Sequence, residues 1–334
     1  PQAAAVRALG DQQGAVVAMN YETGEILALV STPTYDPNRL TTVDLEVARE
    51  AWTELLDSPT EPLKNRATRE IYPPGSTFKL VTAAAALEDG MVPSSELDSP
   101  VSLPLPNSSR SIGNSTNCGG TTVTLQQALQ TSCNTAFGSL ALDLGDEKLR
   151  AMAEAFGFNQ EPTVDIAAAT SRFPTELDEA QTALSGIGQY DVAASPLQIV
   201  QVAAAIANDG VMMSPYLVNT VTSQDLTVLN SRTPEVIGQP ISASSAELLQ
   251  QMMVATVEDG TGRPAQTDGV VVGGKTGTAQ TAPDRPPYAW FVGYAEEPTV
   301  AIVAFVENAD VDRDDISGGR LAAPIFKAVL EALR

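Results

Sequence analysis

The feature that most constrains the fold is the separation of the strand-like segments into two groups at opposite ends of the chain. Apolar runs at 14–19 and 25–31, joined by a Gly-containing turn, predict a hairpin near the start. Further strand-like runs lie at 269–274, 289–295 and 300–306. We therefore expect an α/β fold of the α+β type, in which both ends of the chain meet in one antiparallel five-stranded sheet. Helices would flank this sheet, and a helical lobe would be inserted between its two parts.

Helical patterns fill the middle of the chain. Apolar spacing and capping residues predict helices over 77–87, 125–144, 196–208, 246–258 and 321–334. The second of these is interrupted at 131–134, and residues 92–120, rich in Pro, Ser, Asn and Gly, predict a long irregular segment. No repeat or linker divides the sequence, so we expect residues 1–334 to form one domain.

The composition excludes several classes of function. The chain has no histidine, which rules out Ser-His-Asp catalysis, Cys-His catalysis and His-ligated zinc or haem. Two cysteines cannot form a four-cysteine metal site, so we expect no metal and no cofactor. A net charge of −22 disfavours nucleic-acid binding. An enzyme of this composition must move protons with Lys, Tyr, Asp, Glu or water.

One candidate site is Ser76 with Lys79, which lies in the apolar run 78–86. Helical spacing places residues three apart on one face, within reach of each other. Burial disfavours an ammonium and would lower the pKa of Lys79 by about 3 units. A neutral Lys79 would take the proton from Ser76 and make its hydroxyl a nucleophile. The alternative is that Ser76 only caps the helix and that Lys79 reaches solvent along its apolar stem.

A second candidate is the sequence from Lys275 to Thr278, which follows the apolar run 270–272. Strand alternation places Lys275 and Gly277 on one face, with Thr276 and Thr278 on the other. Gly277 leaves room for a ligand backbone, and an ammonium with hydroxyl groups suits a carboxylate. The alternative is an ordinary edge strand that ends in a turn.

A third candidate is the tripeptide Ser132-Cys133-Asn134, at the interruption of a helical stretch. The pattern alone is unspecific, because 115–117 has the same form in a polar loop. A serine and an amide held rigidly between two apolar helical segments would relay protons and bind a substrate amide.

In this order, Ser76-x-x-Lys79, Ser132-x-Asn134 and Lys275-Thr276-Gly277 resemble the three motifs of the penicillin-binding proteins and serine β-lactamases. The nucleophile region, with Asn65-Arg66 before Tyr72-Pro-Pro-Gly-Ser76, is similar to that of class B penicillin-binding proteins. The resemblance continues through 18–38, 186–189, 195–198 and 274–280. Residues 20–24 and 132–134 further resemble the PbpA-type proteins of actinobacteria.

The resemblance implies a serine β-lactamase/transpeptidase-like fold and a peptidoglycan D,D-transpeptidase that β-lactam antibiotics inhibit covalently. Ser76 would attack the D-Ala-D-Ala carbonyl of a stem peptide, Lys79 would act as base and Ser132 would relay the proton. The substrate-binding residues would be Asn134, Lys275, Thr276, Gly277 and Thr278. The backbone N–H groups of Ser76 and Thr278 would form the oxyanion hole.

The resemblance also implies a location at the extracytoplasmic face of the cell membrane. We expect an N-terminal membrane helix and a pedestal domain upstream of Pro1, and partners among cell-wall synthesis or division proteins. This location permits a disulfide between Cys118 and Cys133, which would tie the irregular segment to Ser132. Two buried free thiols are the alternative.

Other readings of the same motifs are a hydrolase, either a β-lactamase or a D,D-carboxypeptidase, and a non-catalytic β-lactam sensor. Class A β-lactamases take their deacylating base from a Glu-x-x-Leu-Asn motif. Glu154, Glu161 and Glu176 lack the following Leu-Asn, which favours the transpeptidase. The carbamylated lysine of class D enzymes stays open at this point.

Overall fold

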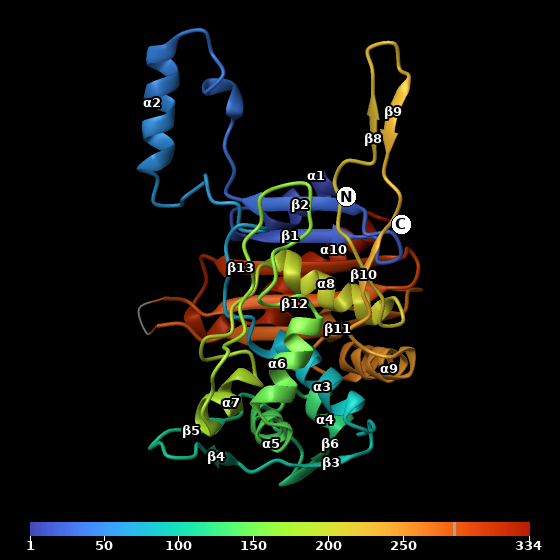
Figure 1. The fold of residues 1–334 in the computed structure, drawn as a ribbon. Coiled ribbons are helices and arrows are strands. Elements are labelled where there is room, and N and C mark those ends of the chain that lie inside the picture. Colours follow the sequence, from blue (N-terminus) through green and yellow to red (C-terminus); the bar gives the residue numbers. More distant parts are fainter. Residues whose placement is uncertain (283–284) are drawn as a thin grey trace.

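One antiparallel sheet joins the two ends of the chain. The computed structural model describes residues 1–282 and 285–334. The sheet has the order β11-β12-β13-β1-β2, so the first strand lies beside the last (Figure 1). Its strands are β1 (Gln13–Met19), β2 (Ile26–Thr32), β11 (Val272–Ala279), β12 (Tyr288–Ala295) and β13 (Val300–Asn308). The predicted α+β class and five-stranded antiparallel sheet are confirmed.

The helices follow the predicted order with additions. They are α1 (Gln2–Leu9), α2 (Leu45–Leu56), α3 (Lys79–Glu88), α4 (Leu125–Gln130), α5 (Asn134–Leu144), α6 (Asp146–Ala155), α7 (Glu179–Ser185), α8 (Pro196–Ala207), α9 (Ala243–Asp259) and α10 (Ala323–Glu331). The predicted interruption separates α4 from α5. Among the described residues, no helix combines the length and the apolar character needed to cross a membrane.

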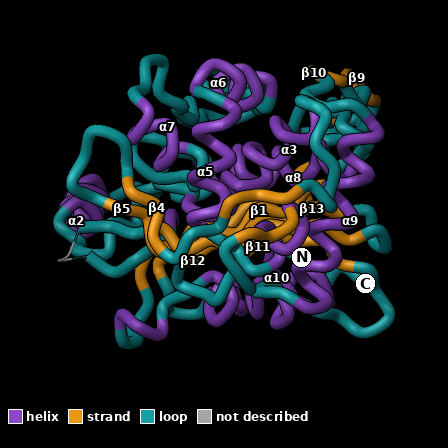
Figure 2. Tube along the Cα trace, turned by 90° about the horizontal axis from the view of Figure 1, so that it is seen from below, coloured by secondary structure: helices purple, strands orange, loops and turns teal. Residues whose placement is uncertain are grey.

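Side chains of the central strand β13 alternate between two cores. Helix α8 packs on one face of the sheet, and helices α1 and α10 cover the other (Figure 2). The α8 side takes Ala301, Val303 and Phe305, and the opposite side takes Val300, Ile302, Ala304 and Val306. A strand covered on both faces is apolar at every position, which explains the uninterrupted run 300–306. Each large apolar side chain buried here contributes about 1.5–3 kcal/mol.

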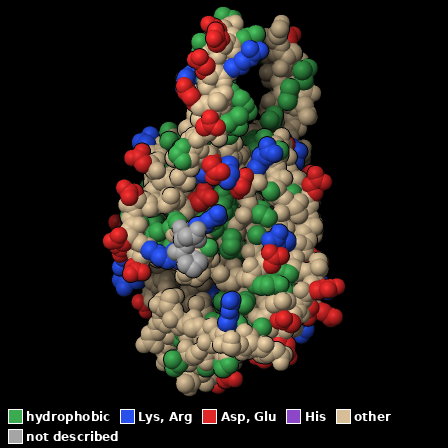
Figure 3. All heavy atoms as spheres, turned by 90° about the vertical axis from the view of Figure 1, so that its left-hand side faces the viewer, with side chains coloured by type: hydrophobic (Ala, Val, Ile, Leu, Met, Phe, Trp, Pro, Cys, Tyr) green, Lys and Arg blue, Asp and Glu red, His purple; other side chains and the backbone are tan. Residues whose placement is uncertain are grey.

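Helices α3 to α7 form the inserted lobe, and α9 packs against the edge strand β11 (Figure 1). Short strands lie between the helices. Between α3 and α4 are β3 (Glu96–Asp98), β4 (Ser102–Pro104), β5 (Ser111–Gly113) and β6 (Thr122–Thr124), and between α8 and α9 are β7 (Met212–Met213), β8 (Thr220–Thr222), β9 (Val228–Ser231) and β10 (Val236–Gly238). Helix α2 and the β8–β9 hairpin project from one end of the molecule (Figures 1 and 3). On the face in Figure 3, acidic and basic side chains are interspersed.

The structure corrects two predicted boundaries. The strand placed at 269–274 instead begins at Val272 and continues to Ala279, because residues 267–270 form a turn in which Gly269 has a φ of 73°. The closing helix predicted from 321 starts as a π-helical turn, Gly318–Ala322, and becomes α-helical at Ala323. Helices α1, α2, α6 and α7 and the β8–β9 hairpin were not predicted.

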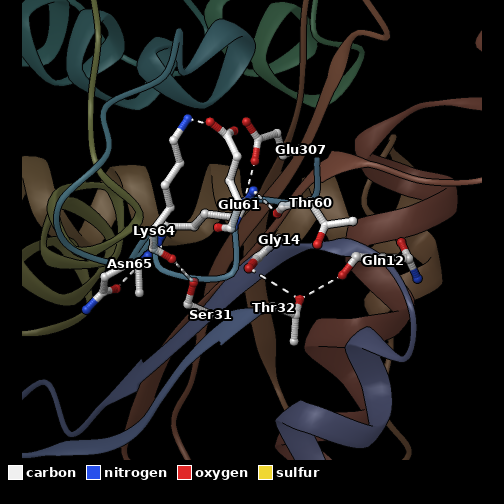
Figure 4. Close-up of polar contacts among 11 residues, drawn as sticks. Gln12, Gly14, Ser31, Thr32, Thr60, Glu61, Lys64, Asn65 and Glu307 are labelled. Atoms are coloured by element: carbon white, nitrogen blue, oxygen red, sulfur yellow. Dashed lines mark hydrogen bonds and ion pairs between the residues drawn. The ribbon is translucent and has the colours of Figure 1, made fainter. Parts of the chain in front are cut away.

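A buried ion pair fastens the segment before Ser76 to the sheet. The Arg66 side chain is fully buried and pairs with Glu307 near the end of β13. The guanidinium also donates to the carbonyls of Thr60 and Glu61. The backbone N–H of Arg66 donates to Ser31 Oγ on β2 (Figure 4). Breaking such a pair would leave a buried charge without a partner, which costs free energy. The loop that carries Arg66 is therefore held against the sheet.

The structure joins Cys118 and Cys133 by a disulfide, with 5.4 Å between their Cα atoms. Cys133 immediately precedes α5 and is fully buried, whereas Cys118 lies in the irregular segment. The bond therefore connects the loop before β6 to the interruption between α4 and α5, which is the pairing considered from the sequence.

We expect the unreduced, denatured protein to show no reactive thiol in a thiol titration, because both cysteines are in this bond. Closing a loop of 15 residues constrains the unfolded chain by about 3 kcal/mol. The variant Cys118→Ala/Cys133→Ala should therefore lose about that much unfolding free energy. Reduced wild-type protein is the control and should titrate two thiols. Two thiols before reduction would contradict the bond.

Candidate active site

The segment before Ser76 is anchored at several points. The backbones of Tyr72 and Ala194 exchange two hydrogen bonds of 2.9 Å, and Trp290 Nε1 donates to Pro73 O at 3.1 Å. The Tyr72 ring is buried beside the Trp290 ring on the sheet. These contacts fix the chain one turn before Ser76, which is itself partly exposed.

Gly75 brings this segment against the edge strand β11. Its φ of 53° is in the left-handed region. A Cβ here would lie 3.0 Å from Thr278 O and 3.1 Å from Ala279 Cα, so only glycine allows the approach. The Gly75 N–H donates to Gly188 O at 3.0 Å. The 3-10 turn Gly75–Phe78 then presents Ser76 next to Thr278 and leads into α3.

Lys79 is the first residue of α3 and its side chain is fully buried. Its Nζ donates to Ser132 O at 2.7 Å and to Asn134 Oδ1 at 2.8 Å, and lies 3.4 Å from Ser132 Oγ. Among the described residues these are its hydrogen-bond partners, and Ser76 is not one of them. The side chain therefore connects α3 to the interruption between α4 and α5.

Burial, with a smaller effect from the Lys275 charge, lowers the pKa of Lys79 well below its usual value. A neutral amine has two N–H donors and one lone pair. The carbonyl oxygens of Ser132 and Asn134 can only accept, so they take both N–H groups. The lone pair is then left for the hydroxyl groups of the site, which is the arrangement that a general base requires.

Ser132 lies in the short segment between the end of α4 and the start of α5. Its φ of 59° is unusual for a residue other than glycine, and strained positions of this kind concentrate at functional sites. This conformation places both its carbonyl and its hydroxyl toward the lysines: Lys275 Nζ donates to Ser132 Oγ at 2.8 Å. Ser132 therefore stands between Lys79 and Lys275.

Lys275 projects from the edge strand β11 and is fully buried. Besides Ser132, its Nζ contacts Thr276 O at 2.9 Å. Burial lowers its pKa to about 7. The charge of Lys275 in turn contributes, after burial, to the lowered pKa of Lys79.

The residues after Lys275 alternate as the strand pattern predicted. Gly277 faces the serine turn, since a Cβ there would lie 2.9 Å from Thr77 Cγ2 and 3.0 Å from Pro74 O. The space beside Gly277 is thus filled by the serine turn, not left for a ligand backbone as the sequence predicted. On the opposite side, Thr276 Oγ1 lies 2.6 Å from Thr261 Oγ1, and Thr278 Oγ1 accepts from the Gly318 N–H at 3.3 Å. The threonine hydroxyls thus contact the turns after α9 and before α10.

The structure brings the three predicted motifs into one site, with one difference. Lys79, Ser132, Asn134 and Lys275 form a continuous hydrogen-bonded chain, and Ser76 stands outside it, because among the described residues the Lys79 amine is held by Ser132 and Asn134. Asn114 and Thr261, which also contact these motifs, were not predicted from the sequence. They lie in loops, where no periodic pattern marks such contacts.

Comparisons with known proteins agree with this geometry. The family described as "Penicillin binding protein transpeptidase domain" matches residues 14–331. The peptidoglycan D,D-transpeptidase PbpA of Mycolicibacterium smegmatis is 45% identical over 332 residues, covering 97% of this chain and 67% of that protein. PbpA of Mycobacterium tuberculosis is 42% identical with the same coverage.

Solved structures give the same result. A ceftriaxone acyl-enzyme complex of penicillin-binding protein A from M. tuberculosis superimposes with a TM-score of 0.94 at 40% identity, over 99% of this chain and 77% of that one. Pseudomonas aeruginosa PBP2 gives a TM-score of 0.83 at 32% identity, over 99% and 73%. With a matching fold, sequence and site, the chain belongs to the penicillin-binding protein transpeptidase family.

Proposed function

We propose that this chain is the catalytic domain of a peptidoglycan D,D-transpeptidase. The observation that carries the proposal is the fully buried Lys79, held by Ser132 and Asn134 one helical turn after Ser76, in surroundings that lower its pKa well below the usual value. The two PbpA relatives named above are peptidoglycan D,D-transpeptidases, and penicillin-binding protein A of M. tuberculosis forms an acyl-enzyme complex with ceftriaxone. The substrates are stem peptides of peptidoglycan, and β-lactams are covalent inhibitors.

The reaction proceeds in two halves. Ser76 Oγ attacks the carbonyl between the two D-alanines, and its proton passes to the Lys79 amine. Ser132 relays a proton to the leaving amine, D-alanine departs and an ester to Ser76 remains. The amine of a second stem peptide then attacks the ester, its proton returns through the same groups, and Ser76 is released. A β-lactam follows the first half, but its leaving nitrogen stays attached to the acyl group.

The groups that would bind the substrate come from the second and third motifs. Asn134 donates one N–H to Gly113 O at 3.0 Å, which leaves its second N–H for a substrate amide. Lys275, Thr276 and Thr278 supply an ammonium and hydroxyl groups for the terminal carboxylate, and Gly277 lets the serine turn pack against the strand that carries them. The N–H groups of Ser76 and Thr278 are the oxyanion donors, each worth about 3 kcal/mol.

The proposed substrate places the enzyme at the extracytoplasmic face of the cell membrane, where peptidoglycan is cross-linked. The Cys118–Cys133 bond suits an oxidising compartment. The curated relatives are longer than this chain, consistent with an N-terminal membrane anchor and pedestal domain elsewhere in the full protein. Cell-wall synthesis or division proteins are the protein partners that this location favours.

The absence of a nearby carboxylate favours transfer to an amine over hydrolysis. Within the described residues, no carboxylate is hydrogen-bonded to the side chain of Lys79, Ser132, Asn134 or Lys275. Glu154 instead accepts from Asn159 Nδ2, and Glu161 and Glu176 are exposed. A class A β-lactamase needs such a carboxylate to activate water.

Ser76→Ala should abolish the penicillin adduct in intact-mass spectra, because it removes the nucleophile. Lys79→Arg should slow acylation by about 10²–10⁴-fold, since arginine keeps the charge but cannot act as a base. Lys148→Arg is the matched control, because Lys148 is exposed, pairs with Asp89 and lies outside the three motifs of the site in the sequence. Acylation of Lys79→Arg at the wild-type rate would refute the role of Lys79.

The penicilloyl adduct should persist for roughly tens of minutes at neutral pH, which corresponds to a deacylation barrier of about 22 kcal/mol. The physical reason is that water finds no carboxylate base beside the ester. Intact mass followed over hours measures the lifetime. Multiple-turnover hydrolysis of nitrocefin would instead identify a β-lactamase.

The second-order acylation constant should be greatest near neutral pH. Protonation of Lys79 removes the base on the acid side, and deprotonation of Lys275 as the pH rises through about 7 removes the charge that attracts the substrate carboxylate. Stopped-flow acylation between pH 5 and 10 measures both limbs. Lys275→Arg should flatten the alkaline limb, because arginine stays charged. A wild-type constant that rises steadily to pH 10 would contradict these assignments.

A further inference from the structure

Helix α5 begins without a cap from its own N-terminal residue. Cys133 occupies the cap position and makes no side-chain capping bond, whereas α4, α7 and α9 are capped by Thr124, Asp178 and Ser242. The first N–H groups of α5, those of Asn134 and Thr135, donate to Asn114 Oδ1 at 2.8 and 3.0 Å. A residue that follows β5 therefore provides the cap of α5.

The same segment also fixes the orientation of the Asn134 side chain. Asn134 Nδ2 donates to Gly113 O at 3.0 Å, and Asn114 Nδ2 donates to Thr135 Oγ1 at 2.9 Å. A carbonyl can only accept, so a flipped Asn134 amide would place its oxygen against Gly113 O. The amide oxygen must therefore point away from Gly113, toward Lys79.

This orientation matters because Asn134 Oδ1 accepts one of the two N–H groups of neutral Lys79, at 2.8 Å. With Ser132 O, it determines where the amine lone pair points. If the hydrogen bonds from Asn114 were lost, the start of α5 could shift. Asn134 Oδ1 would then shift with the helix, and the Lys79 amine that donates to it would rotate. A misplacement of about 1 Å at a distance from the chemistry costs about 10²-fold in rate.

We propose that Asn114 is a positioning residue for acylation. It caps α5 from outside and, together with Gly113, orients Asn134 so that the lone pair of Lys79 faces the serine hydroxyls. This inference rests on the proposed function and extends it to a loop that contains none of the family motifs. The alternative is that Asn114 only stabilises the helix.

The test measures the acylation rate constant and the non-covalent Kd separately, from the dependence of adduct formation on the concentration of a fluorescent penicillin. Asn114→Ala should lower the rate constant by about 10 to 10²-fold with little change in Kd. Asn114→Asp keeps an oxygen acceptor for both N–H groups and should restore the rate constant to near the wild-type value. If the alanine variant does not fold, Asn114→Ser, whose hydroxyl is too short to reach both N–H groups, takes its place.

Ser242→Ala is the matched control, because it removes the cap of α9, which lies outside the site. It should lower Tm and leave the acylation rate constant unchanged. An alanine variant at Asn114 that lowers Tm but acylates as fast as wild type would overturn the proposal, as would a loss confined to Kd. A wild-type protein that forms no adduct at all would instead refute the proposed function.

Discussion

The pairing of β1 with β13 is the constraint on which the rest of the structure depends. It places residues 13–19 against 301–308, so the chain between them must leave the sheet and return to it. The chain leaves through β2 and reaches Ser76, and it returns through β11, which carries Lys275. The inserted lobe, which lies between these two parts of the sheet in the sequence, places Ser132 between Lys79 and Lys275. Because of this sheet topology, Ser132 contacts both Lys79, which is 53 positions away in the sequence, and Lys275, which is 143 positions away.

Two buried amines make the site chemically competent and energetically costly. A lysine whose pKa falls to about 7 lowers the stability of the fold by roughly 4 kcal/mol at pH 7, because the unfolded chain binds its proton more tightly. This cost disappears as the pH rises toward 10.5, the ordinary value for lysine. The two apolar cores around β13 and the buried Arg66–Glu307 pair hold the structure against it. The site can therefore keep a neutral base next to one positive charge.

Periodic features were predictable from the sequence, and contacts between loops were not. Alternation identified the strands and the opposite faces of Lys275 and Thr276, and helical spacing identified α3, α8 and α9. The order of the motifs predicted the candidate site residues, and the structure brings Lys79, Ser132, Asn134 and Lys275 into contact. Spacing along one helix placed Ser76 and Lys79 within reach of each other, but it could not show that acceptors at Ser132 and Asn134 hold the amine. Asn114 was missed since a cap supplied from 20 residues away has no local signature.

The composition of the site explains why it favours transfer to an amine. The titratable side chains in its hydrogen-bonded chain, Lys79 and Lys275, are both amines. In the proposed reaction, Lys79 takes the proton of Ser76 and must release that proton before the second half of the reaction begins. Its lowered pKa makes this loss easy, so Lys79 is ready to accept a proton from the incoming amine. Water is a poorer nucleophile and needs a dedicated carboxylate beside the ester, which the described contacts of the site do not provide. The burial that lowers the pKa of Lys79 therefore suits this amine to its proposed role as base, and the lack of a carboxylate among the described contacts favours an amine over water as the acceptor.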